Sequence, residues 1–217
     1  MAYAQKNIKS PKYRADKFFY VCSYGGCGSW MLVRYLENFG NVYHVHSKCP
    51  PNKLTYVGRE NLGATSTSLN IKEEWFNDIV IPDEELHKYK VIYIYRNPLD
   101  AIYSRFLRPD HLENIEVNPK LTLLDIVEQK RDLYNIYDFY KNYTQPPPPP
   151  VNRNYKIYCV KYEDFFENIE NFNREMEIPD CPQFYPTKKE TSREEILREV
   201  YRDLNEQMSA NDFIKIV

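Results

Sequence analysis

Short apolar runs alternate with amphipathic stretches along the chain. Three of these runs, near residues 18–22, 91–95 and 155–160, are apolar and aromatic, and each leads into sequence with helix-like spacing. Runs of this length are typical of buried strands, and strands that alternate with helices favour a parallel sheet. We therefore predict an α/β fold with a single three-layer domain over residues 17–217, in which helices cover both faces of a parallel central sheet. Residues 1–16 are polar and basic and are predicted to form an N-terminal arm.

The remaining pattern predicts one more strand and several helices. Residues Asn41–Val45 alternate as a strand does, and two prolines soon follow them. Ser192 and Glu195 have the spacing of a capping box at the start of the last helix. The five prolines of Gln145–Pro150 predict a stiff polyproline II spacer. Amphipathic spacing predicts helices at Trp30–Phe39, Glu73–Ile81, Leu121–Tyr143 and Ser192–Met208.

A P-loop-like glycine turn follows the first predicted strand. Gly25, Gly26 and Gly28 lie within four positions although the chain has only 6 Gly, and glycine lets a backbone turn sharply and approach a ligand closely. Ser29 is the predicted N-cap of the helix that follows, and Gly40 is its predicted C-cap. Such a turn can bind phosphate or sulfate, because unpaired N–H groups and the helix dipole both favour an anion. A tight turn without a ligand is the alternative, since the segment matches neither the Lys-containing P-loop motif nor the dinucleotide fingerprint.

A second group of polar residues follows the apolar run KVIYIY. Asn97 is a predicted N-cap, Pro98 suits the first helical position, and Asp100 suits the first helical turn. Arg96 would therefore lie at the carboxyl end of a strand, with Ser104 about two helical turns further on. Open α/β sheets bind ligands at this edge, and arginine presents a planar, charged fork that suits phosphate.

Two histidines mark the predicted strand at 41–45 and its end. His44 and His46 would point to the same face of such a strand. A metal site would need a third ligand, and none follows at useful spacing, so we predict no metal. One structural and one solvent-facing histidine, or a positioned base at the strand end, are the two interpretations.

Composition excludes several classes of function. The chain has 29 Lys+Arg against 31 Asp+Glu, so no global field favours nucleic acid. No apolar run reaches the length of a membrane span, and the N-terminus has no apolar signal segment. The five cysteines are odd in number and lack a CxxC pair, which favours free thiols in a reducing compartment. We therefore expect a cytoplasmic protein.

Three separated segments resemble the sulfotransferase family. SYGGCGSWML is similar to the family's 5′-phosphosulfate-binding loop, YRNPLDAIYSRF to its 3′-phosphate-binding segment, and VKYEDFF to a segment near the adenine. The resemblance covers about residues 17–170 in the family's order. It implies 3′-phosphoadenosine-5′-phosphosulfate (PAPS) as cofactor, adenosine 3′,5′-bisphosphate (PAP) as product, and a P-loop-like α/β fold. The residues that it implies for cofactor binding are Tyr24, Gly25, Gly26, Cys27, Gly28, Ser29, Trp30, Arg96, Ser104 and Tyr162.

The resemblance also implies transfer of a sulfuryl group to a hydroxyl or amine acceptor. It places a base before the second segment, where HVHSKCPP lies, so His46 is the expected base and His44 the alternative. The family usually has Lys or Arg at about the place of Gly26, where the cation stabilises the phosphate leaving group. Lys48 is the expected catalytic cation in its place. The basic residues that could supply this charge are Lys48, Arg34 and Arg59.

Two alternatives stay open beside an active transferase. A non-catalytic or weakly active nucleotide-binding homologue would keep Arg96 and Ser104 but lack an acceptor pocket. A P-loop kinase-like phosphotransferase would share the strand, turn and helix, but it should add a turn lysine and carboxylates for Mg²⁺, and neither is evident. The acceptor class stays open between a carbohydrate, a small molecule, a lipid and a peptide, and the sequence predicts no oligomeric state.

Overall fold

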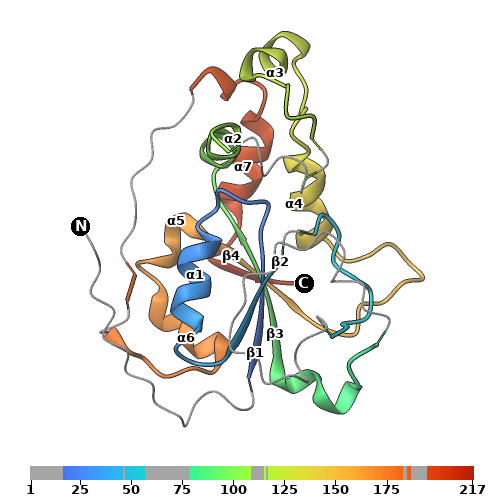
Figure 1. The fold of residues 1–217 in the computed structure, drawn as a ribbon, viewed down its shortest axis with the longest axis vertical. Helices are drawn as coiled ribbons and strands as arrows, with labels where there is room; N and C mark the ends of the chain where they lie inside the picture. Colours follow the sequence, from blue (N-terminus) through green and yellow to red (C-terminus); the bar gives the residue numbers. More distant parts are fainter. Residues whose placement is uncertain are drawn as a thin grey trace.

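A five-stranded sheet runs through the centre of the structure (Figure 1). Its strands lie in the spatial order β2-β1-β3-β4-β5. The structure is a computed structural model that describes residues 17–45, 47–56, 79–108, 115, 117–182, 185–186 and 195–217. The strands are β1 (Phe18–Cys22), β2 (Asn41–Val45), β3 (Tyr89–Tyr95), β4 (Ile157–Lys161) and β5 (Ile214–Ile216). Strands β1 to β4 run parallel, and β5 pairs antiparallel with β4.

The three predicted buried strands lie inside this sheet, which confirms the predicted parallel arrangement. β1 and β3 are neighbours at its centre, and β4 lies between β3 and the short β5. Because β1 to β4 are parallel, their carboxyl ends share one edge, where ligands of open α/β sheets bind. The strand β5 was not predicted, since three residues are too few to show a period of two.

Helices cover both faces of the sheet, as predicted (Figure 1). Side chains alternate between the two faces of each strand, so each face builds its own apolar cluster with the helices above it. One face packs against α1 (Ser29–Leu36), α5 (Tyr162–Phe165) and α6 (Ile169–Met176). The other packs against α2 (Pro98–Phe106), α3 (Leu123–Gln129), α4 (Ile136–Thr144) and α7 (Arg202–Ala210). Two 3₁₀ helices, η3 (Asp83–Lys88) and η6 (Glu195–Leu197), complete the described elements.

Stacked aromatic rings fill the space between β3 and α4. The ring of Tyr93 lies 4.5 Å from that of Tyr143, and Phe139 stacks on Tyr143 at 5.3 Å. Such pairs contribute about 0.5–1.5 kcal/mol each beyond the area they bury. The Tyr143 hydroxyl donates to the Ser47 carbonyl at 2.8 Å, so the buried phenol is satisfied. The ring stack therefore also holds the loop after β2 against α4.

The prediction of one helix over Leu121–Tyr143 is wrong, because the chain breaks between α3 and α4. Lys130 and Asn135 adopt left-handed backbone angles, with φ of 50° and 57°, which interrupt a right-handed helix. Between them, the carboxylate of Asp132 accepts a hydrogen bond from the Tyr137 N–H at 2.8 Å. This bond satisfies an N–H in the first turn of α4, so a new helix starts there. Apolar residues keep helical spacing across the break, which is why the pattern alone predicts a single helix.

The predicted start of the last helix is also wrong. Glu195 lies in the 3₁₀ helix η6, and the α-helix begins only at Arg202, so Glu195 is not its third residue. Ser192, the predicted cap, lies outside the described residues. The helical spacing of the sequence therefore extends beyond the α-helix itself.

The first helix begins one residue earlier and ends three residues earlier than the predicted Trp30–Phe39. Gly28 is its N-cap and Ser29 its first residue, and the helix ends at Leu36, so Gly40 is not its C-cap. Gly40 instead allows a close approach of two chain segments. A Cβ at this position would lie 2.7 Å from the Lys17 carbonyl oxygen.

The structure tests only part of the predictions for the segment Glu73–Ile81, the proline run and the N-terminal arm. The helix predicted at Glu73–Ile81 lies mostly outside the described residues, and its described end is extended, with an antiparallel bridge between Thr55 and Val80. In the proline run, the Val151 N–H donates to the Pro148 carbonyl at 3.1 Å. This bond closes a turn, so the run is not one straight spacer. The predicted arm at residues 1–16 also lies outside the described residues.

Candidate functional site

The glycine turn lies between β1 and α1, at the carboxyl edge of the sheet. Gly25, Gly26 and Gly28 have φ of 102°, 68° and 79°, in the left-handed region that glycine adopts without steric cost. Gly28 is the N-cap of α1, and no side chain caps this helix end. Successive N–H groups in such a turn can form a concavity for anions, and the helix N-terminus adds partial positive charge. The backbone therefore has the form that phosphate or sulfate binding requires.

A side chain from α2 or α5 packs against each glycine of the turn, in the space where a Cβ would lie. In every pair, a Cβ on the glycine would lie closer than 3.0 Å to an atom of the partner, a distance that Cβ atoms essentially never show. The pairs are Gly25 with Arg105, Gly26 with Ser104, and Gly28 with Tyr162. Because two partners come from α2 and one from α5, both helices close directly on the turn.

Arg96 follows β3 and reaches the glycine turn. Its Nη1 donates to the Gly26 carbonyl at 3.4 Å, and its Cζ lies 4.7 Å from the centre of the Tyr162 ring. Its Nη2 pairs with Oδ2 of Asp100 at 3.1 Å, and both side chains are buried. A guanidinium carries five N–H donors, so Arg96 has the capacity to bind an anion while it keeps Asp100 as a partner.

The start of α2 agrees with the sequence prediction. The Asn97 side chain accepts a hydrogen bond from an N–H of the first turn at 2.9 Å, and Pro98 occupies the first helical position. The carboxylate of Glu163 accepts from the Asn97 N–H at 2.9 Å, which joins the start of α2 to α5. From this fixed start the helix carries Ser104 to Gly26, the residue that Arg96 also contacts.

A histidine and a tryptophan lie beside the turn. His44 Nε2 lies 2.9 Å from the Ser29 hydroxyl, and the Trp30 ring stacks on His44 at 5.6 Å. Burial, with a smaller effect of the Arg105 charge, lowers the pKa of His44 to about 4, so the ring is neutral at neutral pH. The Ser29 side chain, the predicted cap of α1, is thus hydrogen-bonded to His44 and does not cap the helix. Trp30 is 47% exposed and carries Arg34 over its ring at 5.6 Å.

Arg105, which the structure places against the turn, was not predicted from the sequence. Its side chain is 3% exposed, and its Nε donates to the Tyr24 carbonyl at 2.8 Å, as does its Nη2. Tyr24 is buried as well, and its hydroxyl donates to the Tyr134 carbonyl at 2.9 Å. Arg105 follows the buried Ala101 by four residues, so helical spacing alone would have placed it on the inner face of α2.

Cys27, the one cysteine of the turn, is buried and unsuited to nucleophilic attack. Its thiol donates to the Gly25 carbonyl at 3.2 Å. Burial raises the pKa of this thiol to about 12, and the charges of Arg96 and Arg105 offset only part of that effect. The thiol therefore stays protonated at neutral pH, and the reactive form of cysteine is the thiolate.

The expected catalytic residues follow β2. His46 and Arg59 lie outside the described residues. Lys48 lies in the loop after β2, where the Asn142 side chain donates to its carbonyl at 3.2 Å. Of the described alternatives for the missing cation, Arg34 lies on α1 and is exposed.

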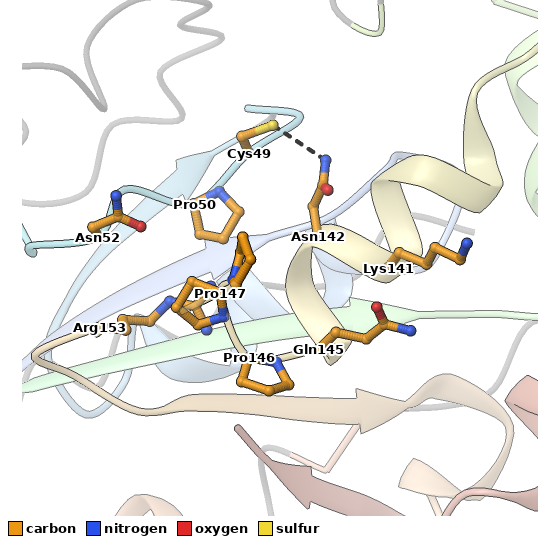
Figure 2. Close-up of a pocket in the computed structure, with 10 residues that line it drawn as sticks. Cys49, Pro50, Asn52, Lys141, Asn142, Gln145, Pro146, Pro147 and Arg153 are labelled. Atoms are coloured by element: carbon orange, nitrogen blue, oxygen red, sulfur yellow. Dashed lines mark hydrogen bonds between the residues drawn. The ribbon is translucent and has the colours of Figure 1, made fainter. Parts of the chain in front are cut away.

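A pocket of about 350 Å³ opens between the loop after β2, the end of α4 and the proline run (Figure 2). Cys49, Asn142 and Arg153 are among its lining residues, and the Asn142 side chain donates to the Cys49 sulfur at 3.1 Å. None of the residues that the sequence suggests for cofactor binding lines this pocket. The pocket and the site at the strand ends are therefore separate features.

Two further properties concern the described residues alone. No group of three or more His, Cys, Asp or Glu side chains among them could hold a metal ion. Within the same part of the chain, no helix has the length and apolar character that crossing a membrane requires.

Comparison with known families identifies one match. The family model described as the sulfotransferase domain matches residues 78–213, more than half of the chain. The matched region contains Arg96, Ser104, Arg105 and Tyr162, whereas the glycine turn precedes it. Comparison with curated proteins found no match, and comparison with solved structures found none either.

Proposed function

Because the chain belongs to the sulfotransferase family, we propose that it transfers a sulfuryl group from PAPS to a hydroxyl or amine acceptor. The observation that carries this proposal is the convergence of Arg96, Ser104 and Tyr162 on the glycine turn. These side chains come from separate elements and meet at the edge of the sheet where ligands bind. PAPS, when bound, supplies an activated sulfuryl group on its 5′-phosphate and a 3′-phosphate that serves recognition.

The residues at the strand ends fit such a donor. The N–H groups of the glycine turn, Tyr24 to Trp30, would hold the 5′-phosphosulfate, because the turn combines left-handed glycines with an uncapped helix start. Arg96 and Ser104, which meet at Gly26, would hold the 3′-phosphate. The exposed ring of Trp30 and the ring of Tyr162 would flank the adenine.

Transfer also needs a base for the acceptor. The acceptor loses a proton as its new bond to sulfur forms and the bond from sulfur to the phosphate oxygen breaks, so the electron pair stays on that oxygen. We assign the proton to His46, which follows Val45, the last residue of β2, in the sequence. His44 suits this role less well, because its Nε2 is engaged by Ser29 and its pKa is lowered to about 4. Lys48 is the proposed catalytic cation near the leaving group.

Nucleotide binding is the first test. Removing Arg96 alone would leave Asp100 buried without its cation, so we compare Arg96→Ala/Asp100→Asn with Asp100→Asn. We expect the double variant to bind PAP about 10- to 100-fold more weakly in calorimetry, because a charge-assisted phosphate contact is lost. Asp100→Asn alone is the matched control. Equal affinities of the two variants, or wild-type protein that prefers AMP to PAP, would contradict the assignment.

Sulfuryl transfer is the second test, and it separates the enzyme from a binding-only protein. The latter is the second candidate, and the absence of Lys and Arg from residues 23–29 favours it. Labelled PAPS is offered with a panel of carbohydrates, phenols, lipids and peptides. We expect a labelled product, and His46→Asn should lower its rate about 100-fold while PAP affinity is unchanged. PAP binding without transfer to any acceptor class would favour the binding-only protein.

A further inference from the structure

The glycine turn has no basic side chain of its own. Residues 23–29, SYGGCGS, include neither Lys nor Arg. A sulfuryl donor leaves negative charge on its phosphate, and fixed positive groups stabilise such charge most strongly where water is excluded. We propose that Arg105 supplies the positive charge of the turn from α2 and positions the turn's N–H groups for the 5′-phosphate. This inference rests on the proposed function.

The packing of the turn shows that the cation has a place built for it. The guanidinium of Arg105 occupies the space that a side chain on Gly25 would need, since a Cβ there would collide with three of its atoms. A side chain at position 25 would therefore have to displace the guanidinium of Arg105. The guanidinium of Arg105 reaches the turn from α2 because Gly25 has no side chain to occupy that space.

The hydrogen bonds of the arginines orient the turn. In a trans peptide, the C=O of one residue and the N–H of the next point in opposite directions. Arg105 holds the carbonyl of Tyr24 and Arg96 holds that of Gly26. The N–H groups of Gly25 and Cys27 are therefore directed away from the respective guanidinium groups. Since Arg105 is almost completely buried and acts through the backbone, it is a positioning residue.

The charge of Arg105 is felt on both sides of the turn. It lowers the pKa of His44 on β2, and it opposes the increase that burial causes in the pKa values of Tyr24 and Cys27. These three groups belong to the turn and to the strand beside it. The field of the guanidinium thus extends over the region where the 5′-phosphate would lie.

Three nucleotides separate the roles of the two arginines. PAP carries both phosphates, 5′-AMP only the 5′-phosphate, and 3′-AMP only the 3′-phosphate. In calorimetry, Arg105→Met should weaken PAP and 5′-AMP binding about 10- to 100-fold and leave the affinity for 3′-AMP unchanged. Arg96→Ala/Asp100→Asn should weaken the binding of 3′-AMP and leave the affinity for 5′-AMP unchanged. The matched control is Arg108→Met, which removes an exposed arginine that follows the same helix.

The outcomes for proposal and function are distinct. Wild-type protein that binds none of the three nucleotides would overturn the proposed function itself. If wild type binds PAP and Arg105→Met loses affinity for all three equally, or for none, the role of Arg105 is overturned and the function stands. If Arg105 were merely structural, Arg105→Met would lose affinity for all three nucleotides equally and would also unfold at a lower temperature.

A second variant covers the possibility that Arg105→Met does not fold. Arg105→Lys keeps the charge and the buried stem, although it loses the fork that holds Tyr24. We expect this variant to weaken 5′-AMP binding relative to wild type without changing the affinity for 3′-AMP. Where both variants fold, lysine should retain more 5′-AMP affinity than methionine. Equal losses for the two nucleotides in Arg105→Lys would overturn the inference.

Discussion

Single residues in this site act mainly on backbone. Arg96 and Arg105 donate to carbonyl oxygens of the turn, and Asn97 accepts from an N–H of α2. The hydrogen bond between Ser29 and His44 and the ion pair between Arg96 and Asp100 join two side chains instead. Substitutions at these positions should therefore change the shape of the turn as well as remove a contact.

The contact between Gly28 and Tyr162 gives a prediction for one methyl group. Gly28→Ala places a Cβ against the Tyr162 ring in a left-handed backbone, and we expect it to lower the free energy of unfolding by about 2 kcal/mol. In a Tyr162→Leu background the collision is relieved while the backbone strain persists. The cost of Gly28→Ala should then fall by about 1 kcal/mol in urea titrations. An identical cost in both backgrounds would show that backbone strain alone is responsible.

His44 should make stability depend on pH. Its pKa is about 4 in the folded protein against an ordinary value of 6.5, so below pH 6.5 the unfolded chain binds more protons at this site. The contribution of neutral His44 to the free energy of unfolding is complete well above pH 6.5 and is lost as the pH falls toward 4. Between pH 6.5 and 5, wild type should lose about 2 kcal/mol more unfolding free energy than His44→Asn.

A second histidine provides the control for this measurement. His87 lies in η3 and is exposed, so His87→Asn should keep the wild-type pH dependence. A wild-type curve as flat as that of His44→Asn would mean that His44 is as easily protonated in the folded protein as in the unfolded chain.

At the scale of whole elements, α2 connects the fold to the site. It starts at Asn97, directly after β3 and Arg96, and its inner face carries Ser104 and Arg105 to the turn. The sequence predicted this start because Asn, Pro and Asp occupy the positions that a helix N-terminus favours. It did not identify Arg105, because arginine is rarely buried in proteins, although helical spacing puts this residue on the inner face of α2.

The carboxylate of Asp132 holds the start of α4 after the break at Lys130 and Asn135, so we predict a measurable effect of Asp132→Ala. The side chain accepts from the N–H groups of Tyr134 and Tyr137 and from the Tyr201 hydroxyl. Its loss leaves these donors without their acceptor and should lower the free energy of unfolding by about 1–3 kcal/mol. Asp138→Ala removes an exposed carboxylate from α4 and should lower the free energy of unfolding by less than about 0.5 kcal/mol. Equal costs for both variants in urea titrations would contradict a capping role for Asp132.

The whole molecule is a parallel sheet with one antiparallel edge. The parallel part could be predicted, because three apolar runs with helix-like sequence after each leave little choice of topology. β5 could not, since a strand of three residues is defined by its partner and not by its own pattern. Likewise, the approach of α5 to Gly28 is a property of tertiary packing that no local spacing encodes.

The pairing of β5 predicts different effects for two neighbouring prolines. Ile157 and Val217 exchange both backbone hydrogen bonds, so the pair Cys159 and Lys215, two residues on, is also hydrogen-bonded in an antiparallel ladder. Lys215→Pro removes one of these donors and should lower the free energy of unfolding by about 1–2 kcal/mol more than Ile216→Pro, whose N–H points away from β4. Chemical denaturation of both variants measures the difference, and equal losses would contradict this register.

The fit between the three glycines and their partners has an evolutionary consequence. The two residues of each pair constrain each other. The atoms of Arg105, Ser104 and Tyr162 fill the space in which side chains at positions 25, 26 and 28 would begin. A related protein with a side chain at position 25 would need a residue 105 whose side chain is smaller or turns away from that space. We expect positions 25 and 105 to vary together across related sequences, so that a large side chain at position 25 is accompanied by a smaller residue at position 105.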